Sequence, residues 1–238
     1  MPTAKICEIR QETPLVRCFV LELEEEEFDF LPGQWIDLLV PIRGRVHIGG
    51  YSITSSPLQK GQIELAIRKA HHNPVTRYLH EQARVGDVVG ISAAQGNFYY
   101  HPQMGDNLVL IGGGIGIAPL MSIIRFVTES NPVARVKFLY SIRTPEEFVF
   151  RKELQALAQQ FPGFRLNVTV TGATSEPWSG QCGRFDARSL READLDPRAI
   201  YYLCGSQAMT ADISQALTTI GVPPYRLISE TWQEIAEG

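Results

Sequence analysis

A long apolar segment, residues 108–124, is interrupted in its middle by glycine at four of five consecutive positions and by Pro119. The segment is long enough to suggest a membrane-spanning helix, but so many glycines disfavour one. A buried strand, a tight turn and a helix suit the same residues better. We therefore expect no insertion into a membrane. Residues 1–5 lack the apolar stretch of a signal peptide, so a cytoplasmic location is expected.

The glycine turn at residues 112–116 points to a bound pyrophosphate. Glycine lets the backbone approach a phosphate closely, and the free N–H groups at the start of the next helix attract an anion. We expect that helix to begin at about Pro119, because proline favours the first helical position. The spacing departs from the usual Gly-x-Gly-x-x-Gly pattern, since Ile117 stands at its last position. A turn that only packs the helix on the strand therefore remains an alternative.

Residues 201–209 (YYLCGSQAM) form a second pattern of strand, turn and helix. This pattern places Cys204 at the carboxyl end of a parallel strand, where ligands of open α/β sheets bind. A small buried residue in front of a turn is the other interpretation of Cys204.

The pattern of apolar residues changes near residue 102 and predicts two domains, residues 1–102 and 103–238. The second half alternates apolar strands with amphipathic helices, which predicts a parallel sheet in a nucleotide-binding α/β domain. Its expected strands are 108–111, 136–140, 166–171 and 200–204, and its expected helices are 119–128, 145–160 and 207–220.

The first half contains short strands separated by tight turns, which predicts a small closed antiparallel β-barrel. The expected strands are 15–23, 35–40, 48–54, 63–67 and 88–92. One helix interrupts them, with Asn73 as its N-cap and Pro74 at its first position. The predicted fold class is thus a β-barrel followed by an α/β domain.

Charge and cysteine content exclude several functions. The net charge is −4 and the basic residues form no stripe, so a nucleic-acid partner is not expected. The four cysteines are scattered without a Cys-x-x-Cys pair, so neither structural zinc nor an iron–sulfur cluster is expected.

Six segments together resemble the ferredoxin–NADP reductase superfamily along nearly the whole chain. They are residues 30–38 (FLPGQWIDL), 51–57 (YSITSSP), 86–88 (GDV), 96–98 (GNF), 112–119 (GGGIGIAP) and 204–209 (CGSQAM). Within this superfamily, residues 48–57 and 68–74 are most similar to the oxidoreductase NAD-binding domain-containing proteins.

The resemblance implies a flavin in the barrel and a nicotinamide dinucleotide in the second domain. The residues that would bind these cofactors are Tyr51, Ser52, Ile53, Thr54, Arg68, Asn73, Val75, Thr76, Gly113, Gly114, Ile115, Gly116, Pro119, Arg143, Cys204, Gly205, Met209 and Trp232. Ser52, Cys204 and Glu230 would lie nearest to the transferred hydride. Trp232 would cover the flavin until the nicotinamide displaces it.

One position departs from the superfamily, which carries an arginine for the flavin phosphate two residues before the Tyr-Ser pair. This chain has Gly49 there, and an arginine is not easily replaced at a bidentate site. FAD is expected in preference to FMN.

NADH is expected in preference to NADPH, because residues 171 and 172 are Thr and Gly where NADPH-dependent members carry Ser-Arg. Gly172→Arg is accordingly expected to improve the use of NADPH. Electrons would pass from NADH to bound FAD and then to a separate redox protein or a small-molecule acceptor. A nucleotide-binding subunit without turnover, and a reductase of free flavin, are the alternatives.

Overall fold

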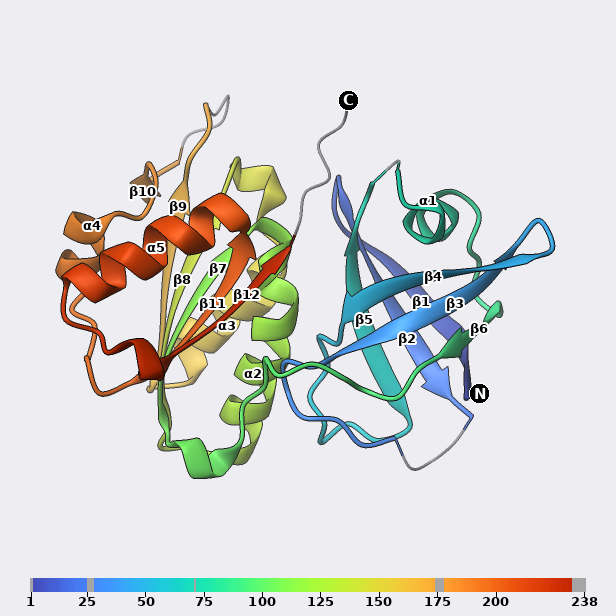
Figure 1. The fold of residues 1–238 in the computed structure, drawn as a ribbon, viewed down its shortest axis with the longest axis horizontal. Coiled ribbons are helices and arrows are strands. Elements are labelled where there is room, and N and C mark those ends of the chain that lie inside the picture. The colour runs from blue at the N-terminus through green and yellow to red at the C-terminus, as the bar shows by residue number, and fades with distance from the viewer. Residues whose placement is uncertain (1, 25–27, 71, 174–177, 233–238) are drawn as a thin grey trace.

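The computed structural model describes residues 2–24, 28–70, 72–173 and 178–232, which form two β-sheets side by side (Figure 1). The first sheet has six strands in the order β4-β3-β6-β1-β2-β5, and its neighbours pair antiparallel. The second has six strands in the order β10-β9-β8-β7-β11-β12, all parallel. The predicted fold class is confirmed.

The antiparallel sheet curls into a barrel around an apolar core. Its strands are β1 (Thr3–Thr13), β2 (Val16–Leu23), β3 (Trp35–Ile42), β4 (Arg45–Ser52), β5 (Gln62–Arg68) and β6 (Val88–Ile91). Closure occurs just after β4, where Ile53 forms a bridge to Leu65 and the Thr54 N–H donates to the Glu64 carbonyl oxygen at 2.8 Å. Helix α1 (Pro74–Glu81) packs on β4 and β3. Closure therefore fixes the backbone immediately after the Tyr51-Ser52 pair.

The parallel sheet contains β7 (Asn107–Gly113), β8 (Arg135–Ile142), β9 (Phe164–Val170), β10 (Gln181–Cys182), β11 (Ile200–Ser206) and β12 (Leu227–Trp232). Its helices are α2 (Ile117–Ser130), α3 (Arg151–Gln160), α4 (Ala187–Glu192) and α5 (Gln207–Thr219). Short 3₁₀ turns lie at Pro102–Met104, Gly114–Gly116, Pro145–Glu147 and Pro224–Arg226. None of the helices in the described ranges has both the length and the apolar character needed to cross a bilayer.

The helices divide between the two faces of the parallel sheet. Helices α4 and α5 cover the face away from the barrel, and α2 lies between the sheet and the barrel (Figure 1). The buried cluster around α2 also includes Val16, Cys18 and Ala66 of the barrel. One apolar core thus continues across the boundary between the two halves, so the halves are packed rather than loosely linked.

The structure differs from the sequence expectations at several elements, among them β1 and α3. Strand β1 was not predicted, because its sequence is mostly polar and only alternate residues such as Ala4 and Ile6 are buried. The helix expected over residues 145–160 begins instead at Arg151. Phe150 adopts a left-handed conformation (φ 57°), which no continuous helix allows.

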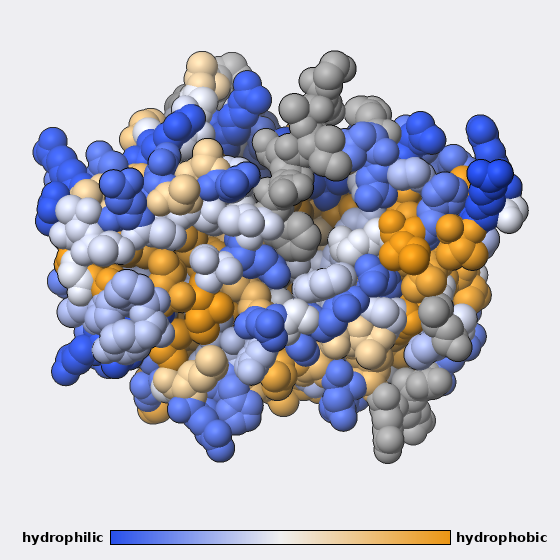
Figure 2. All heavy atoms as spheres, viewed as in Figure 1, coloured by the Kyte–Doolittle hydropathy of each residue, from blue (hydrophilic) through white to orange (hydrophobic). Residues whose placement is uncertain are grey.

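Strand β4 lies at an edge of its sheet and has an apolar outer side. Val46 and Ile48 are 64% and 60% exposed there, and hydrophobic atoms are visible over this part of the barrel (Figure 2). Ser52, at the other end of the same strand, is only 3% exposed. The cofactor candidates therefore lie at the buried end of β4, toward the parallel sheet.

Candidate functional site

The glycine turn joins β7 to α2 through a single 3₁₀ turn. Gly114 has a φ of +52°, a conformation that glycine adopts without steric cost. The α-helix begins at Ile117, so Pro119 lies within the first helical turn and not at its start as predicted. The buried Tyr140 hydroxyl donates a hydrogen bond to the Gly114 carbonyl oxygen at 2.9 Å. This contact from β8 holds the turn in place, and no sequence motif had pointed to Tyr140.

Other groups closely approach two of these glycines, Gly113 and Gly116. A Cβ atom on Gly116 would lie 2.4 Å from the Cys204 carbonyl oxygen. A Cβ atom on Gly113 would lie 2.2 Å from the sulfur of Met209, which also packs on Gly205. The two strand–turn–helix segments predicted from the sequence therefore touch each other at the carboxyl ends of β7 and β11.

A pocket of about 390 Å³ opens at the carboxyl ends of these strands. Its walls include the glycine turn, Gly205, Met209 and Arg143, all of which were predicted to bind a cofactor. Arg68 joins them from the barrel, and its guanidinium lies 3.8 Å from the Cβ position of Gly114. A pocket at this edge, lined by a glycine turn and by cations, fits a pyrophosphate-containing nucleotide.

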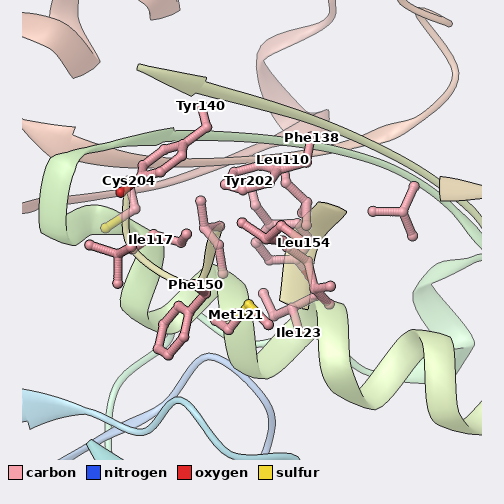
Figure 3. Packing of buried hydrophobic residues seen from close by; sticks show 14 of the residues in the cluster. Leu110, Ile117, Met121, Ile123, Phe138, Tyr140, Phe150, Leu154, Tyr202 and Cys204 are labelled. Atoms are coloured by element: carbon pink, nitrogen blue, oxygen red, sulfur yellow. The ribbon is translucent and has the colours of Figure 1, made fainter. Parts of the chain in front are cut away.

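Cys204 comes one residue before Gly205 of the pocket wall and lies in the apolar core around α2. It is in register with Gly112 of β7 and with Glu230 of β12. Its side chain is fully buried and points toward Ile117 and Tyr140 (Figure 3). The predicted trio of Ser52, Cys204 and Glu230 therefore includes one pair that the structure places on adjacent strands.

Two buried side-chain oxygens find no hydrogen-bond partner among the described residues, and both belong to predicted site residues. They are Ser52 Oγ and Glu230 Oε2. An unsatisfied buried polar atom costs about 1–3 kcal/mol and calls for a ligand or another explanation. Burial also raises the pKa of Glu230 from 4.5 to about 7, because desolvation disfavours its charged form.

Tyr51 explains how the chain accommodates Gly49. The Tyr51 ring folds back over Gly49, where an added Cβ would lie 2.7 Å from the phenolic oxygen. That hydroxyl shares a 2.9 Å hydrogen bond with Thr76 Oγ1 at the start of α1. A side chain at position 49 would displace the ring, so the missing arginine and the placement of Tyr51 are linked.

The side chain of Asn73 caps the N-terminus of α1. Asn73 Oδ1 accepts hydrogen bonds from the N–H groups of Val75 and Thr76 at 2.9 and 3.1 Å, as expected for an N-cap. These two groups were also predicted to face the flavin pyrophosphate. Because Asn73 already satisfies them, a phosphate there would have to share them.

The other predicted site residues lie near the end of β4 or near the nucleotide pocket. Ile53 and Thr54 are fully buried at the closure of the barrel, and Ile115 lines the pocket. Trp232 ends β12, but its side chain lies outside the described residues. Ser206, which the sequence had not singled out, lines the pocket and caps α5 by accepting from the Met209 N–H.

The residues present fit both expected cofactors. The nucleotide side offers a pocket with a glycine turn and cations. The barrel side offers Tyr51 and the buried Ser52 Oγ, which has no hydrogen-bond partner among the described residues. Ser52 and Tyr51 would hold a flavin, while Gly113, Gly116 and Arg143 would hold a dinucleotide.

Comparison with protein families agrees with this division. Residues 3–100 match the model of the oxidoreductase FAD-binding domain, and residues 110–215 match that of the oxidoreductase NAD-binding domain. Fold and site thus define an FAD- and NAD-binding oxidoreductase of the ferredoxin–NADP reductase superfamily. Within it, the chain belongs to the family of oxidoreductase NAD-binding domain-containing protein 1. It is 32% identical to the Bos taurus member over 252 residues, covering 96% of this chain and 80% of that protein.

Two further similarities extend beyond this family. The glycine betaine monooxygenase reductase subunit of Chromohalobacter salexigens is 30% identical over 217 residues, covering 89% of this chain and 58% of that protein. The crystal structure of the flavohem-like FAD/NAD-binding domain of Vibrio cholerae nitric oxide dioxygenase superposes with a TM-score of 0.86 at 25% identity. That match covers 97% of this chain and 98% of the other.

Proposed function

We propose that this protein oxidises NADH with a bound FAD and passes the electrons to a separate acceptor. The observation that carries the proposal is the buried Ser52 Oγ at the end of β4, which has no hydrogen-bond partner within the described part of the chain. Unpartnered buried hydroxyls are rare in native proteins, so this atom supports a ligand with a complementary polar group. The glycine-turn pocket, lined in part by Arg68 of the barrel, supports a dinucleotide on the adjoining side.

In this proposal the protein supplies position and electrostatics. A bound FAD would supply the redox chemistry, as an acceptor of hydride and a donor of single or paired electrons. Gly113 and Gly116 let the backbone approach the NADH pyrophosphate, and Arg68 and Arg143 offset its charge. Cys204 and Met209 limit the space beside the nicotinamide, and Ser52 Oγ offers a hydrogen bond to the flavin ring. With a pKa raised to about 7 by burial, the Glu230 carboxyl is partly protonated near neutral pH, and it lies next to Cys204 in the sheet.

Glu230→Gln is expected to remove a pH dependence of stability. The folded pKa is raised, so the contribution of Glu230 to stability is fully present below its unfolded pKa and is lost as the pH rises from about 4.5 to about 7. Relative to wild type, the variant should gain roughly 1 kcal/mol in unfolding free energy between pH 4.5 and pH 8, after allowance for the part of the side chain that solvent screens. Urea unfolding at several pH values measures this gain, and a difference that stays constant with pH would contradict it.

The preference for NADH is supported by Thr171 in the pocket wall, but the structure changes the substitution that tests it. A Cβ on Gly172 would lie 2.8 Å from the Arg143 carbonyl oxygen. Gly172→Arg would therefore shift the backbone, so it does not test the preference cleanly. Thr171→Arg places a cation in the same pocket. We expect it to improve the ratio of NADPH to NADH use by about tenfold, equivalent to roughly 1.4 kcal/mol from one new charge pair. Steady-state kcat/KM for both nucleotides measures this, and an unchanged ratio would count against the assignment.

The acceptor is proposed to be a separate redox protein. The relative described as the reductase subunit of a monooxygenase supports this. A small-molecule acceptor is the other outcome to be distinguished.

The test is NADH oxidation by gel-filtered protein with ferricyanide as electron acceptor and no added flavin. We expect turnover that depends on the protein. Turnover only after free FAD or FMN is supplied would instead favour a reductase of free flavin, which Gly49 and the self-capped α1 also fit. Binding of NADH without turnover under either condition would favour a nucleotide-binding subunit.

A further inference from the structure

Helix α2 is hydrogen-bonded to the chain segment that follows β4. The Ser122 hydroxyl donates to the Ser55 carbonyl oxygen at 2.7 Å, and Arg125 Nη1 donates to the Thr54 carbonyl oxygen at 2.9 Å. Thr54 and Ser55 follow Ser52 by two and three residues, and both are buried. We call the contacts of Ser122 and Arg125 with Thr54, Ser55 and Glu64 the α2 clasp.

Arg125 is held in its position from both halves of the protein. Its Nη1 also donates to Glu64 Oε1 of β5 at 2.7 Å, and its Nε and Nη2 donate to the Glu153 carboxylate of α3, each at 2.7 Å. Only 15% of its side chain is exposed. The guanidinium also lies 5.0 Å from the centre of the Phe150 ring, which extends toward the barrel (Figure 3). A planar guanidinium with this many fixed partners has one available geometry.

The α2 clasp connects the nucleotide pocket to the residues that follow Ser52. At one end, α2 begins directly after the glycine turn that lines the nucleotide pocket. At the other, Thr54 and Ser55 continue the backbone of Ser52. Because α2 is a rigid element, its bonds to Thr54 and Ser55 set the position of the nucleotide pocket relative to Ser52.

We propose that Arg125 and Ser122 are positioning residues, which hold the nicotinamide at transfer distance from the flavin without contacting either cofactor. This inference rests on the proposed function. Hydride transfer requires reacting atoms about 3–3.5 Å apart, and a displacement of about 1 Å reduces rates by about 100-fold. Binding of the nucleotide itself uses only residues of the pocket and should not depend on the clasp.

The test compares Arg125→Met with two other variants of the same network. Arg125→Lys keeps a donor for Thr54 or Glu64, and Glu153→Gln alters only the contact within the second half. We expect Arg125→Met to slow flavin reduction by NADH at least tenfold, while the Kd for ADP-ribose changes less than threefold. Arg125→Lys should recover part of the rate, and Glu153→Gln should stay within twofold of wild type.

A second readout needs no flavin. In calorimetry, wild type should unfold in one transition and Arg125→Met in two, because the halves lose the hydrogen bonds from Arg125 to Thr54 and Glu64. If NADH does not reduce the flavin of the wild-type protein, the proposed function fails. Calorimetry alone then tests whether the α2 clasp links the two halves. A single transition in both proteins would overturn the clasp in that case.

If wild type is reduced, a rate for Arg125→Met within twofold of wild type overturns the inference, as does an equal loss in Glu153→Gln. Should Arg125→Met not fold, Ser122→Ala replaces it, since it removes only the bond to Ser55. Ser122→Ala is expected to slow flavin reduction by NADH about threefold and to leave the Kd for ADP-ribose unchanged. An unchanged rate of flavin reduction would again overturn the inference.

Discussion

Gly116→Ala is expected to slow flavin reduction by NADH by about 100-fold, because it moves the glycine turn away from β11. The added Cβ would lie 2.4 Å from the Cys204 carbonyl oxygen and 2.7 Å from its carbon. Both atoms belong to the backbone of a central strand, so the turn and the start of α2 must shift instead. The unfolding free energy should fall by about 2–3 kcal/mol as well, as in other overpacked sites. Anaerobic stopped-flow absorbance measures the rate, and urea unfolding measures the stability.

Gly44→Asn is the control for this substitution. Unlike Gly116 (φ −60°), Gly44 has a positive φ (+76°), and no atom lies within 4 Å of its Cβ position. Asparagine tolerates that conformation, so stability should change by less than about 0.5 kcal/mol and the reduction rate should not change. A Gly116→Ala protein that reduces flavin at the wild-type rate would show that the close contact with Cys204 is not needed.

Glu64→Ala is expected to lower the unfolding free energy by about 3–5 kcal/mol, since it leaves two cations without their buried partner. Glu64 is 8% exposed and accepts from Arg10 Nη2 at 2.8 Å, from Arg125 Nη1 at 2.7 Å and from Thr54 Oγ1 at 2.7 Å. Burial alone would raise the pKa of Glu64, but the guanidinium of Arg125 and the other donors lower it overall. Its contribution to stability is therefore present above the unfolded pKa and is lost as the pH falls through the folded pKa.

A surface ion pair provides the comparison for Glu64. Asp29 Oδ1 lies 3.2 Å from Lys60 Nζ, and 91% of the Asp29 side chain is exposed. Asp29→Ala should therefore lower the unfolding free energy by less than about 0.5 kcal/mol. Urea unfolding of both variants at pH 7 measures the two losses. Similar small losses in both would show that the buried network contributes no more than a solvated pair.

Local patterns predicted the parts of the fold that depend on neighbouring residues. The glycine turn, the Asn73 cap and the alternation of strands and helices after residue 106 each follow from propensities over a few positions. Strand β1 was missed because few of its residues are apolar, and pairing with β2 and with the distant β6 stabilises it.

Contacts between the two halves could not be predicted from the sequence. Glu64 and Arg125 are 61 positions apart, and no periodicity connects them. Phe150 is forced into a left-handed conformation where its N–H donates to Glu12 of β1, so the helix expected from residue 145 cannot start there. Tertiary bonds of this kind override helix propensity.

The candidate site shows the same division. The residue types at Tyr51, Ser52, Cys204 and Glu230 were apparent from resemblance to a family, but their burial and the unsatisfied oxygens were not. The packing of Tyr51 over Gly49 likewise required coordinates, because it depends on a side-chain direction. The roles of these residues stay predictions until they are measured.

The central claim is that this chain binds FAD and reduces it with NADH. The most direct test is the visible absorbance spectrum of the purified, gel-filtered protein, followed anaerobically as NADH is added. We predict a yellow protein that NADH bleaches, and NADPH should bleach it more slowly at equal concentration. A colourless protein that does not retain FAD or FMN after incubation and a second gel filtration would contradict the claim.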